Sequence, residues 1–147
     1  MRQKQKKLVI NTDRCMGCCA CEIACKMEYE LPRGVRFIVM NEIEDSTLSK
    51  EKLIFRFDIC RHCEHPACME VCPHKSIYKR EDGIVLVDET SCTGCRLCYA
   101  ACPWHVPRFG EKGIMQKCSL CALRLDKGLR PSCVIACPAE AIQVVEY

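Results

Sequence analysis

Short apolar runs, broken by glycine, proline and cysteine, set the pattern of this chain and indicate strands of only a few residues. Three runs combine apolar and β-branched residues and are predicted to be strands: residues 7–11, 53–57 and 141–145. Two more, residues 77–79 and 84–87, flank Asp82-Gly83, which is a hairpin turn signal. No apolar run approaches the roughly 18 to 20 residues that a membrane helix needs. The pattern predicts a small α+β protein of short helices and β-hairpins.

Composition adds one dominant feature, the number of cysteines. The chain has 147 residues, enough for one domain or two very small ones, and 17 of them are cysteine. This density is typical of disulfide scaffolds and of metal proteins. The basic start, residues 1–7, leads directly into Leu8-Val9-Ile10, an apolar stretch too short for a secretory signal. We therefore expect a cytoplasmic protein without membrane insertion, whose thiols stay reduced and bind metal.

Charge and side-chain chemistry argue against several other classes of function. The formal net charge of +3 comes with only 6% aromatic residues and no basic stripe, so no nucleic-acid partner is expected. Nothing resembles an acid–base pair, a nucleophile or a nucleotide-binding loop. We predict no catalytic residue and no substrate site within this chain.

The spacing of the cysteines is the most informative pattern. Sixteen of them form four groups of four: Cys15-x2-Cys18-x2-Cys21-x3-Cys25; Cys60-x2-Cys63-x4-Cys68-x3-Cys72; Cys92-x2-Cys95-x2-Cys98-x3-Cys102; and Cys118-x2-Cys121-x11-Cys133-x3-Cys137. A proline directly follows each of the last three groups. Only Cys19 is left over, and we interpret it as a small packed thiol.

Three kinds of cysteine site are compatible with such a count, and the spacing separates them. A disulfide scaffold would need eight bridges without an export signal, and C-x2-C neighbours rarely bridge each other without strain. A zinc site uses two C-x2-C pairs but has no need for a third cysteine at x2 and a fourth at x3 before proline. That full pattern is typical of bacterial ferredoxins, in which three cysteines curl around one cubane and the fourth, at the start of a helix, ligates the other cluster. The groups therefore predict iron–sulfur clusters, four of the [4Fe-4S] type.

The order of strands and cysteine groups predicts two nested ferredoxin-like modules. The second and third groups, with the hairpin between them, complete an inner module over residues 53–109. The first and fourth groups, with the first and last predicted strands, form the halves of an outer module over residues 1–52 plus 110–147. One module is thus inserted into the other, and each cluster joins distant segments of the chain.

The nesting, with exchanged fourth ligands, predicts which cysteines share a cluster. We refer to the four sets as sites 1 to 4. Site 1 consists of Cys15, Cys18, Cys21 and Cys137; site 2 of Cys25, Cys118, Cys121 and Cys133; site 3 of Cys60, Cys63, Cys68 and Cys102; and site 4 of Cys72, Cys92, Cys95 and Cys98.

Several segments carry a family resemblance as well. They are Cys60-Arg61-His62-Cys63-Glu64-His65-Pro66-Ala67-Cys68, Lys79-Arg80-Glu81-Asp82-Gly83-Ile84-Val85, Cys92-Thr93-Gly94-Cys95-Arg96-Leu97-Cys98 and Lys127-Gly128-Leu129-Arg130-Pro131. Together with the sixteen cysteines they resemble the iron–sulfur electron-transfer subunits of the dimethyl sulfoxide reductase and formate dehydrogenase family. The resemblance covers nearly the whole chain. Some relatives replace one cysteine of the third group and carry a three-iron cluster, but Cys95 is present here.

The resemblance implies a relay between a large catalytic subunit of molybdenum or tungsten pterin type and an electron acceptor, which is a further subunit or a ferredoxin. It implies that site 1 faces the catalytic subunit and that sites 2, 3 and 4 follow in order. A tungsten aldehyde oxidoreductase of anaerobic metabolism is the favoured kind of complex, because membrane-associated relatives usually continue beyond the equivalent of Tyr147. The alternatives are a subunit of a hydrogenase or carbon monoxide dehydrogenase, or a free polyferredoxin shuttle.

Other residues near the cysteines receive simpler interpretations. Four histidines, His62, His65, His74 and His105, are not predicted as ligands because sixteen cysteines already complete four clusters. Residues 31–34 indicate a turn within the long segment 28–52, which is either a docking surface or a solvated connector.

Overall fold

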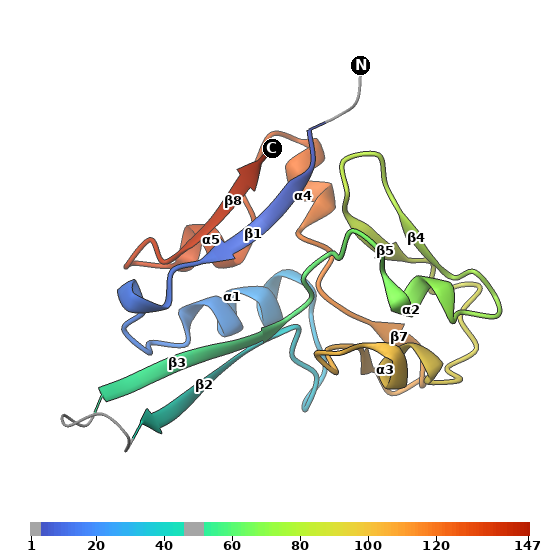
Figure 1. The fold of residues 1–147 in the computed structure, drawn as a ribbon, viewed down its shortest axis with the longest axis horizontal. Coiled ribbons are helices and arrows are strands. Elements are labelled where there is room, and N and C mark those ends of the chain that lie inside the picture. Colours follow the sequence, from blue (N-terminus) through green and yellow to red (C-terminus); the bar gives the residue numbers. More distant parts are fainter. Residues whose placement is uncertain (1–3, 46–51) are drawn as a thin grey trace.

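The structure, a computed structural model, describes residues 4–45 and 52–147. Short helices and two-stranded sheets alternate along the chain (Figure 1). Their bounds are β1 Lys6–Ile10, η1 Thr12–Arg14, α1 Ala20–Glu28, β2 Ile38–Asp45, β3 Lys52–Ile59, α2 Ala67–Glu70, β4 Ile77–Lys79, β5 Val85–Val87, α3 Leu97–Ala101, β6 Arg108–Phe109, β7 Met115–Gln116, α4 Ala122–Asp126, α5 Ser132–Ala136 and β8 Ile142–Glu146. The predicted α+β character is confirmed, and each predicted strand is present to within two residues at either end.

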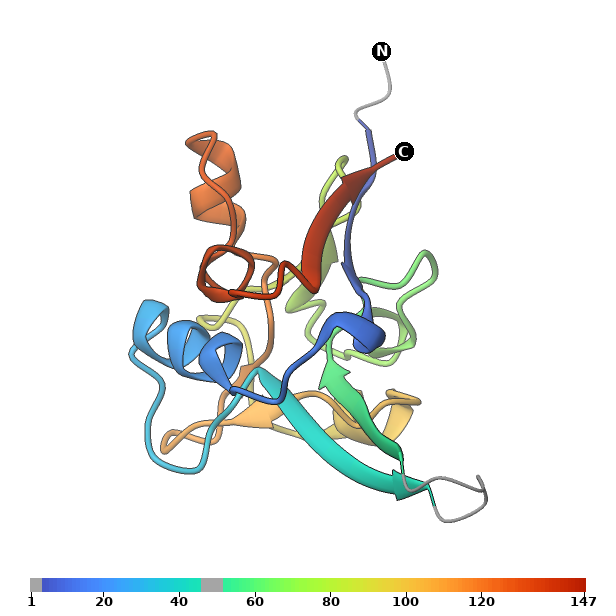
Figure 2. The same ribbon diagram turned by 90° about the vertical axis from the view of Figure 1, so that its left-hand side faces the viewer.

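Four antiparallel strand pairs organise the described part of the chain. β1 pairs with β8, with Lys6 opposite Glu146 and Ile10 opposite Ile142, and both views show these two strands side by side (Figures 1 and 2). β4 pairs with β5 in the expected hairpin, and the remaining pairs are β2 with β3 and β6 with β7. The first and last strands of the described residues are therefore held together, while three strand pairs lie between them.

The β4–β5 hairpin closes through a turn over residues 80–83. The amide of Gly83 donates to the carbonyl of Arg80 at 3.0 Å, and Gly83 has φ +83, which glycine adopts without strain. The buried carboxylate of Asp82 accepts from the Arg80 guanidinium at 3.1 and 3.2 Å, and the same guanidinium bonds Asp126 of α4 at 2.6 Å. Arg80 thus connects the hairpin to α4, a helix about forty residues later in the chain.

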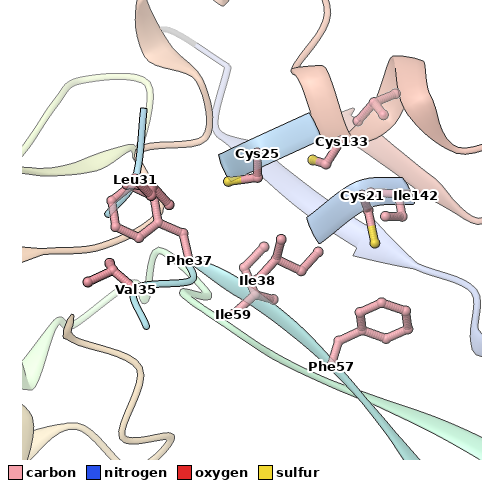
Figure 3. Packing of buried hydrophobic residues seen from close by; sticks show 11 residues of the cluster. Cys21, Cys25, Leu31, Val35, Phe37, Ile38, Phe57, Ile59, Cys133 and Ile142 are labelled. Carbon is pink, nitrogen blue, oxygen red and sulfur yellow. The ribbon is translucent and has the colours of Figure 1, made fainter. Parts of the chain in front are cut away.

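The largest group of buried apolar side chains lies between α1, α5 and the β2–β3 sheet (Figure 3). α1 packs against α5, and β2 packs against α1. Leu31, Val35, Phe37 and Ile38 enter this core from the segment that follows α1. The interpretation of that segment as a solvated connector is therefore wrong for its described part, whereas the turn at residues 31–34 is confirmed. The apolar residues just after the turn pack beneath the helix and begin β2.

Three smaller apolar groups fill the rest of the interior. One surrounds Ile77 and Met115, one surrounds Val106, and one surrounds Ile84 and Leu120. The first two include cysteines, as the main core does. The interior is therefore divided into parts, and most parts are lined by thiols. The longest helix in the described residues, α1, has nine residues. No helix in this part of the chain is long and apolar enough to cross a membrane.

Candidate metal cluster sites

A helix begins one residue before the third cysteine of every group. The third cysteine is the second residue of the helix in all four groups: Cys21 in α1, Cys68 in α2, Cys98 in α3 and Cys133 in α5. The fourth cysteine follows one turn later, at or just beyond the end of α2, α3 and α5. The prediction that the fourth cysteine begins a helix is therefore wrong: the helix starts at the third and ends near the fourth. Because proline follows Cys72, Cys102 and Cys137, those helices stop there, whereas α1 lacks this proline and continues to Glu28.

The loop after the first cysteine of each group contains a left-handed residue. The second residue after the first cysteine of each group has positive φ: Gly17 (+72), His62 (+46), Gly94 (+71) and Leu120 (+54). This turn aims backbone amides back at sulfur, since the amides of Gly17 and Leu120 donate to Cys15 Sγ and Cys118 Sγ at 3.5 and 3.4 Å. Gly94 has a second reason to be glycine, because a Cβ there would collide with the carbonyl oxygen of Gly113. The four loops therefore repeat one local design.

Further backbone amides approach sulfurs outside the loops. Ala141 donates to Cys137 Sγ at 3.3 Å, and Met115 donates to Cys92 Sγ at 3.5 Å. Burial raises the pKa of Cys72, but the amides of Ser76 and His74 outweigh it and bring the pKa below its ordinary value. Hydrogen bonds of this kind stabilise thiolates and tune iron–sulfur clusters.

Two pockets of nearly equal size are each lined by four of the predicted ligand cysteines. One encloses about 340 Å³ of space free of protein atoms, including solvent at its mouth, and the other about 330 Å³. The cysteines of the first are Cys15, Cys18, Cys21 and Cys137, and those of the second are Cys72, Cys92, Cys95 and Cys98. These are the residues of sites 1 and 4. Cys19 also lines the first pocket, with its thiol donating to the Gly17 carbonyl at 3.7 Å.

The cysteines of sites 2 and 3 are neighbours as well, and most are more deeply buried. Burial, together with the nearby Cys118 and Cys121 thiols, raises the pKa of Cys25 to about 12. Burial, together with the nearby Cys121 and Cys25 thiols, raises the pKa of Cys133 to about 12. Figure 3 shows the sulfurs of Cys25 and Cys133 pointing the same way, whereas that of Cys21 points elsewhere.

In site 3, burial raises the pKa of Cys68 to about 11, and its neighbouring thiols are Cys60, Cys102 and Cys63. Cys118 of site 2 packs against the apolar group that contains Cys60 and Cys102. Sites 2 and 3 therefore adjoin each other in the interior.

The residues present fit iron–sulfur clusters. A buried thiol with a raised pKa holds its proton at neutral pH, and a metal that replaces the proton removes the cost of burying a thiolate. Within residues 4–45 and 52–147, no three His, Cys, Asp or Glu side chains are arranged to hold a single metal ion. The cysteines of sites 1 and 4 instead line pockets, which suits a cubane that offers each sulfur a different iron.

Sequence reasoning passed over one buried polar residue beside these sites, Lys117. Its ammonium donates to the carbonyl of Val85, a residue whose amide in turn donates to His62 Nδ1 at 3.0 Å. Burial, and then the charge of Lys117, lower the pKa of His62 well below its ordinary value, so this histidine is neutral. The only sequence signal for Lys117 is its position directly before Cys118.

Fold and sites together define an iron–sulfur protein of the ferredoxin-like class, and comparison with known families agrees. A family model described as "4Fe-4S dicluster domain" matches residues 51–147. More particularly, the chain belongs to the family of iron–sulfur electron-transfer subunits of the dimethyl sulfoxide reductase type, and it carries 4Fe-4S clusters.

Three relatives illustrate this membership. A subunit of the anaerobic dimethyl sulfoxide reductase of Escherichia coli (strain K12) is 40% identical over 142 residues, covering 90% of this chain and 69% of the relative. The thiosulfate reductase electron transfer subunit from Salmonella typhi is 40% identical, covering 88% of this chain and 70% of the relative. A putative iron-sulfur subunit of dimethyl sulfoxide reductase from Halobacterium salinarum is 34% identical, covering 91% of this chain and 63% of the relative.

Proposed function

We propose that this chain is an electron relay in which four [4Fe-4S] clusters, one at each of sites 1 to 4, carry electrons in series between a catalytic subunit and an acceptor. The observation that carries the proposal is the exposure of the cysteines. Cys18 of site 1 and Cys95 of site 4 are exposed, whereas every cysteine of sites 2 and 3 is buried or half-buried. Two accessible ends and two enclosed centres are what a relay with one entry and one exit requires.

Contacts between consecutive sites support the order of the relay. α1 carries both Cys21 of site 1 and Cys25 of site 2. Cys118 of site 2 and Cys60 of site 3 are close enough for their charges to interact. α2 carries Cys68 of site 3 and is followed by Cys72 of site 4, which links the last two centres. Consecutive sites are therefore linked either by one helix or by two neighbouring thiols.

Strand and helix pairing supports the nested modules, residues 1–52 plus 110–147 and residues 53–109. The β1–β8 pair and the α1–α5 contact unite the two ends of the chain, and β4–β5 with the α2–α3 contact unites its middle. In Figure 1, β1, β8, α1 and α5 lie on one side and β4, β5, α2 and α3 on the other, whereas β3 is drawn with β2 on the first side and β7 is drawn on the second. The β2–β3 and β6–β7 pairs each join a strand of one module to a strand of the other.

The partner at site 1 is proposed to be a large catalytic subunit with a molybdenum or tungsten pterin, because the relatives are named as subunits of dimethyl sulfoxide and thiosulfate reductases. Exposed apolar side chains at site 1 and along α1 suit a docking surface: Met16 is 64% exposed, and Ile23 and Met27, one turn apart on α1, are 58% and 74% exposed. We propose the cytoplasm as its compartment. A tungsten aldehyde oxidoreductase remains our favoured complex, and nickel without molybdenum or tungsten in the co-purified complex would favour a hydrogenase or carbon monoxide dehydrogenase instead.

Metal analysis tests the cluster count directly. Anaerobically purified protein is expected to be brown and to contain about sixteen irons and sixteen acid-labile sulfides per chain, four of each for every [4Fe-4S] site. The measurements are iron and sulfide assays with a visible charge-transfer spectrum. Stoichiometric zinc and a colourless protein would contradict the proposal.

A cysteine substitution tests the exchanged ligands. Cys137→Ala is expected to damage the cluster of site 1, although Cys137 is closer in sequence to the last cysteines of site 2. The matched control is Cys133→Ala, four residues earlier in α5, the helix that Cys137 directly follows, and it should damage site 2 instead. Electron paramagnetic resonance of the reduced proteins separates the two outcomes, and loss of the same signal in both variants would overturn the assignment.

A further inference from the structure

One lysine is buried between the two enclosed sites. Lys117 directly precedes Cys118 and is only 6% exposed. Its ammonium donates to the carbonyl of Val85 in β5 and to the carbonyl of Cys118, the latter at 3.1 Å. The side chain is therefore held from two directions, by a strand of the middle part of the chain and by a ligand loop of the last part.

The described residues give this buried charge no carboxylate partner, although other buried or half-buried charges, such as Asp82 and Arg80, are paired. Burying an ammonium group without a compensating anion is costly, and two carbonyl dipoles offset only part of the cost. A cation in this position therefore points to a permanent negative charge nearby. No described acidic side chain provides it.

The groups that hold Lys117 belong to the surroundings of two different sites. Toward site 2, the ammonium bonds the carbonyl of the ligand cysteine Cys118. Toward site 3, it bonds the carbonyl of Val85; Cys68 packs against the apolar group that contains Val85, and the Val85 amide donates to His62 Nδ1, in the loop between Cys60 and Cys63, at 3.0 Å. Because Cys118 also adjoins Cys60, the ammonium lies where the relay passes from site 2 to site 3.

We propose that Lys117 is a fixed positive charge that stabilises the reduced clusters at sites 2 and 3 and thereby sets the reduction potentials of the two inner centres. This inference rests on the proposed four-cluster relay. Reduction of either cluster takes one electron from the neighbouring centre and adds a negative charge to a group that its thiolates already make anionic. A nearby cation therefore favours the reduced form, and it acts on both sides of the inner electron transfer. No bond or proton changes place in this step.

Lys117 also has a structural role through its two hydrogen bonds, so the test must separate charge from hydrogen bonding. Lys117→Gln keeps a donor and removes the charge, Lys117→Met keeps the length and apolar stem and removes both, and Lys117→Arg keeps the charge. Lys112→Gln removes one charge from an exposed position in the same segment and is the matched control.

The experiment is a redox titration of the iron-loaded chain, followed by electron paramagnetic resonance. The signals are assigned through cysteine variants of each site. In Lys117→Gln, two of the four couples, those of sites 2 and 3, should become harder to reduce by about tenfold or more in equilibrium constant, which is about 59 mV for a one-electron couple. Lys117→Arg should keep both potentials at the values of the unsubstituted protein, and Lys112→Gln should leave all four potentials unchanged.

Each alternative result overturns the inference. Unchanged potentials in Lys117→Gln, or shifts confined to sites 1 and 4, would show that the charge does not tune the inner centres. If both the Gln and Met variants lose iron, Lys117 is needed for cluster retention and is not a tuning charge. Failure of the relay itself is a separate result, because it would appear in the unsubstituted protein as fewer than four couples or sixteen irons.

Discussion

Replacing Cys121 by alanine is expected to reduce electron transfer from the catalytic subunit to the distal acceptor to background. Cys121 is buried beside Ser132 and belongs to the enclosed site 2, which lies between sites 1 and 3 in the proposed order. Electron tunnelling falls steeply with distance, so a missing centre in a series cannot be bypassed by its neighbours. The measurement is acceptor reduction by the purified complex with excess substrate.

Two controls make the outcome of this substitution specific. An artificial dye that reaches the catalytic subunit directly should still be reduced, since that chemistry lies outside this chain. Lys127→Ala, at an exposed position just after α4, the helix that Cys121 directly precedes, should leave transfer to the distal acceptor unchanged. Normal transfer in a Cys121→Ala complex that has lost the site 2 signal would show that electrons take another path.

Removing iron should unfold the chain. Each site joins segments far apart in sequence, and the apolar interior is divided into small groups that are partly lined by thiols. A single structural zinc site contributes about 10–16 kcal/mol in small metal-dependent folds, and a whole domain has a net stability of about 5–15 kcal/mol. Loss of metal from several sites therefore exceeds the stability available. Circular dichroism after anaerobic chelation should show that most of the native signal disappears.

Reversal provides the control for iron removal. Incubation of the reduced, iron-free chain with ferrous iron and sulfide should restore both the visible spectrum and the circular dichroism. An iron-free chain that keeps its native spectrum and unfolds cooperatively in denaturant would contradict the expectation, because its apolar groups alone would then suffice.

Cysteine spacing predicts the family and the local sites because it is dictated by the geometry of a bound group rather than by packing. The strand β2 escapes prediction, since after Ile38 and Met40 its second half, Glu42 to Asp45, is mostly polar and shows no apolar alternation. The β2–β3 and β6–β7 pairings depend on how distant segments meet, which a local pattern does not encode. The burial of Lys117 cannot be predicted for a related reason: lysine is usually exposed, and only the three-dimensional structure shows that this one is buried.

The β1–β8 pair gives the protein an order of assembly during synthesis. A growing chain contains every cysteine of sites 3 and 4 once residue 102 has been made, so these two centres can mature early. Sites 1 and 2 must wait for Cys137 and Cys133, and β1 must wait for β8, which follows all sixteen predicted ligands. Until then Cys15, Cys18 and Cys21 are held by a segment with no partner strand. Site 1, which is proposed to face the catalytic subunit, is thus the last of the four sites to have all its ligands. A partly synthesised chain therefore lacks the complete surface that would bind the catalytic subunit.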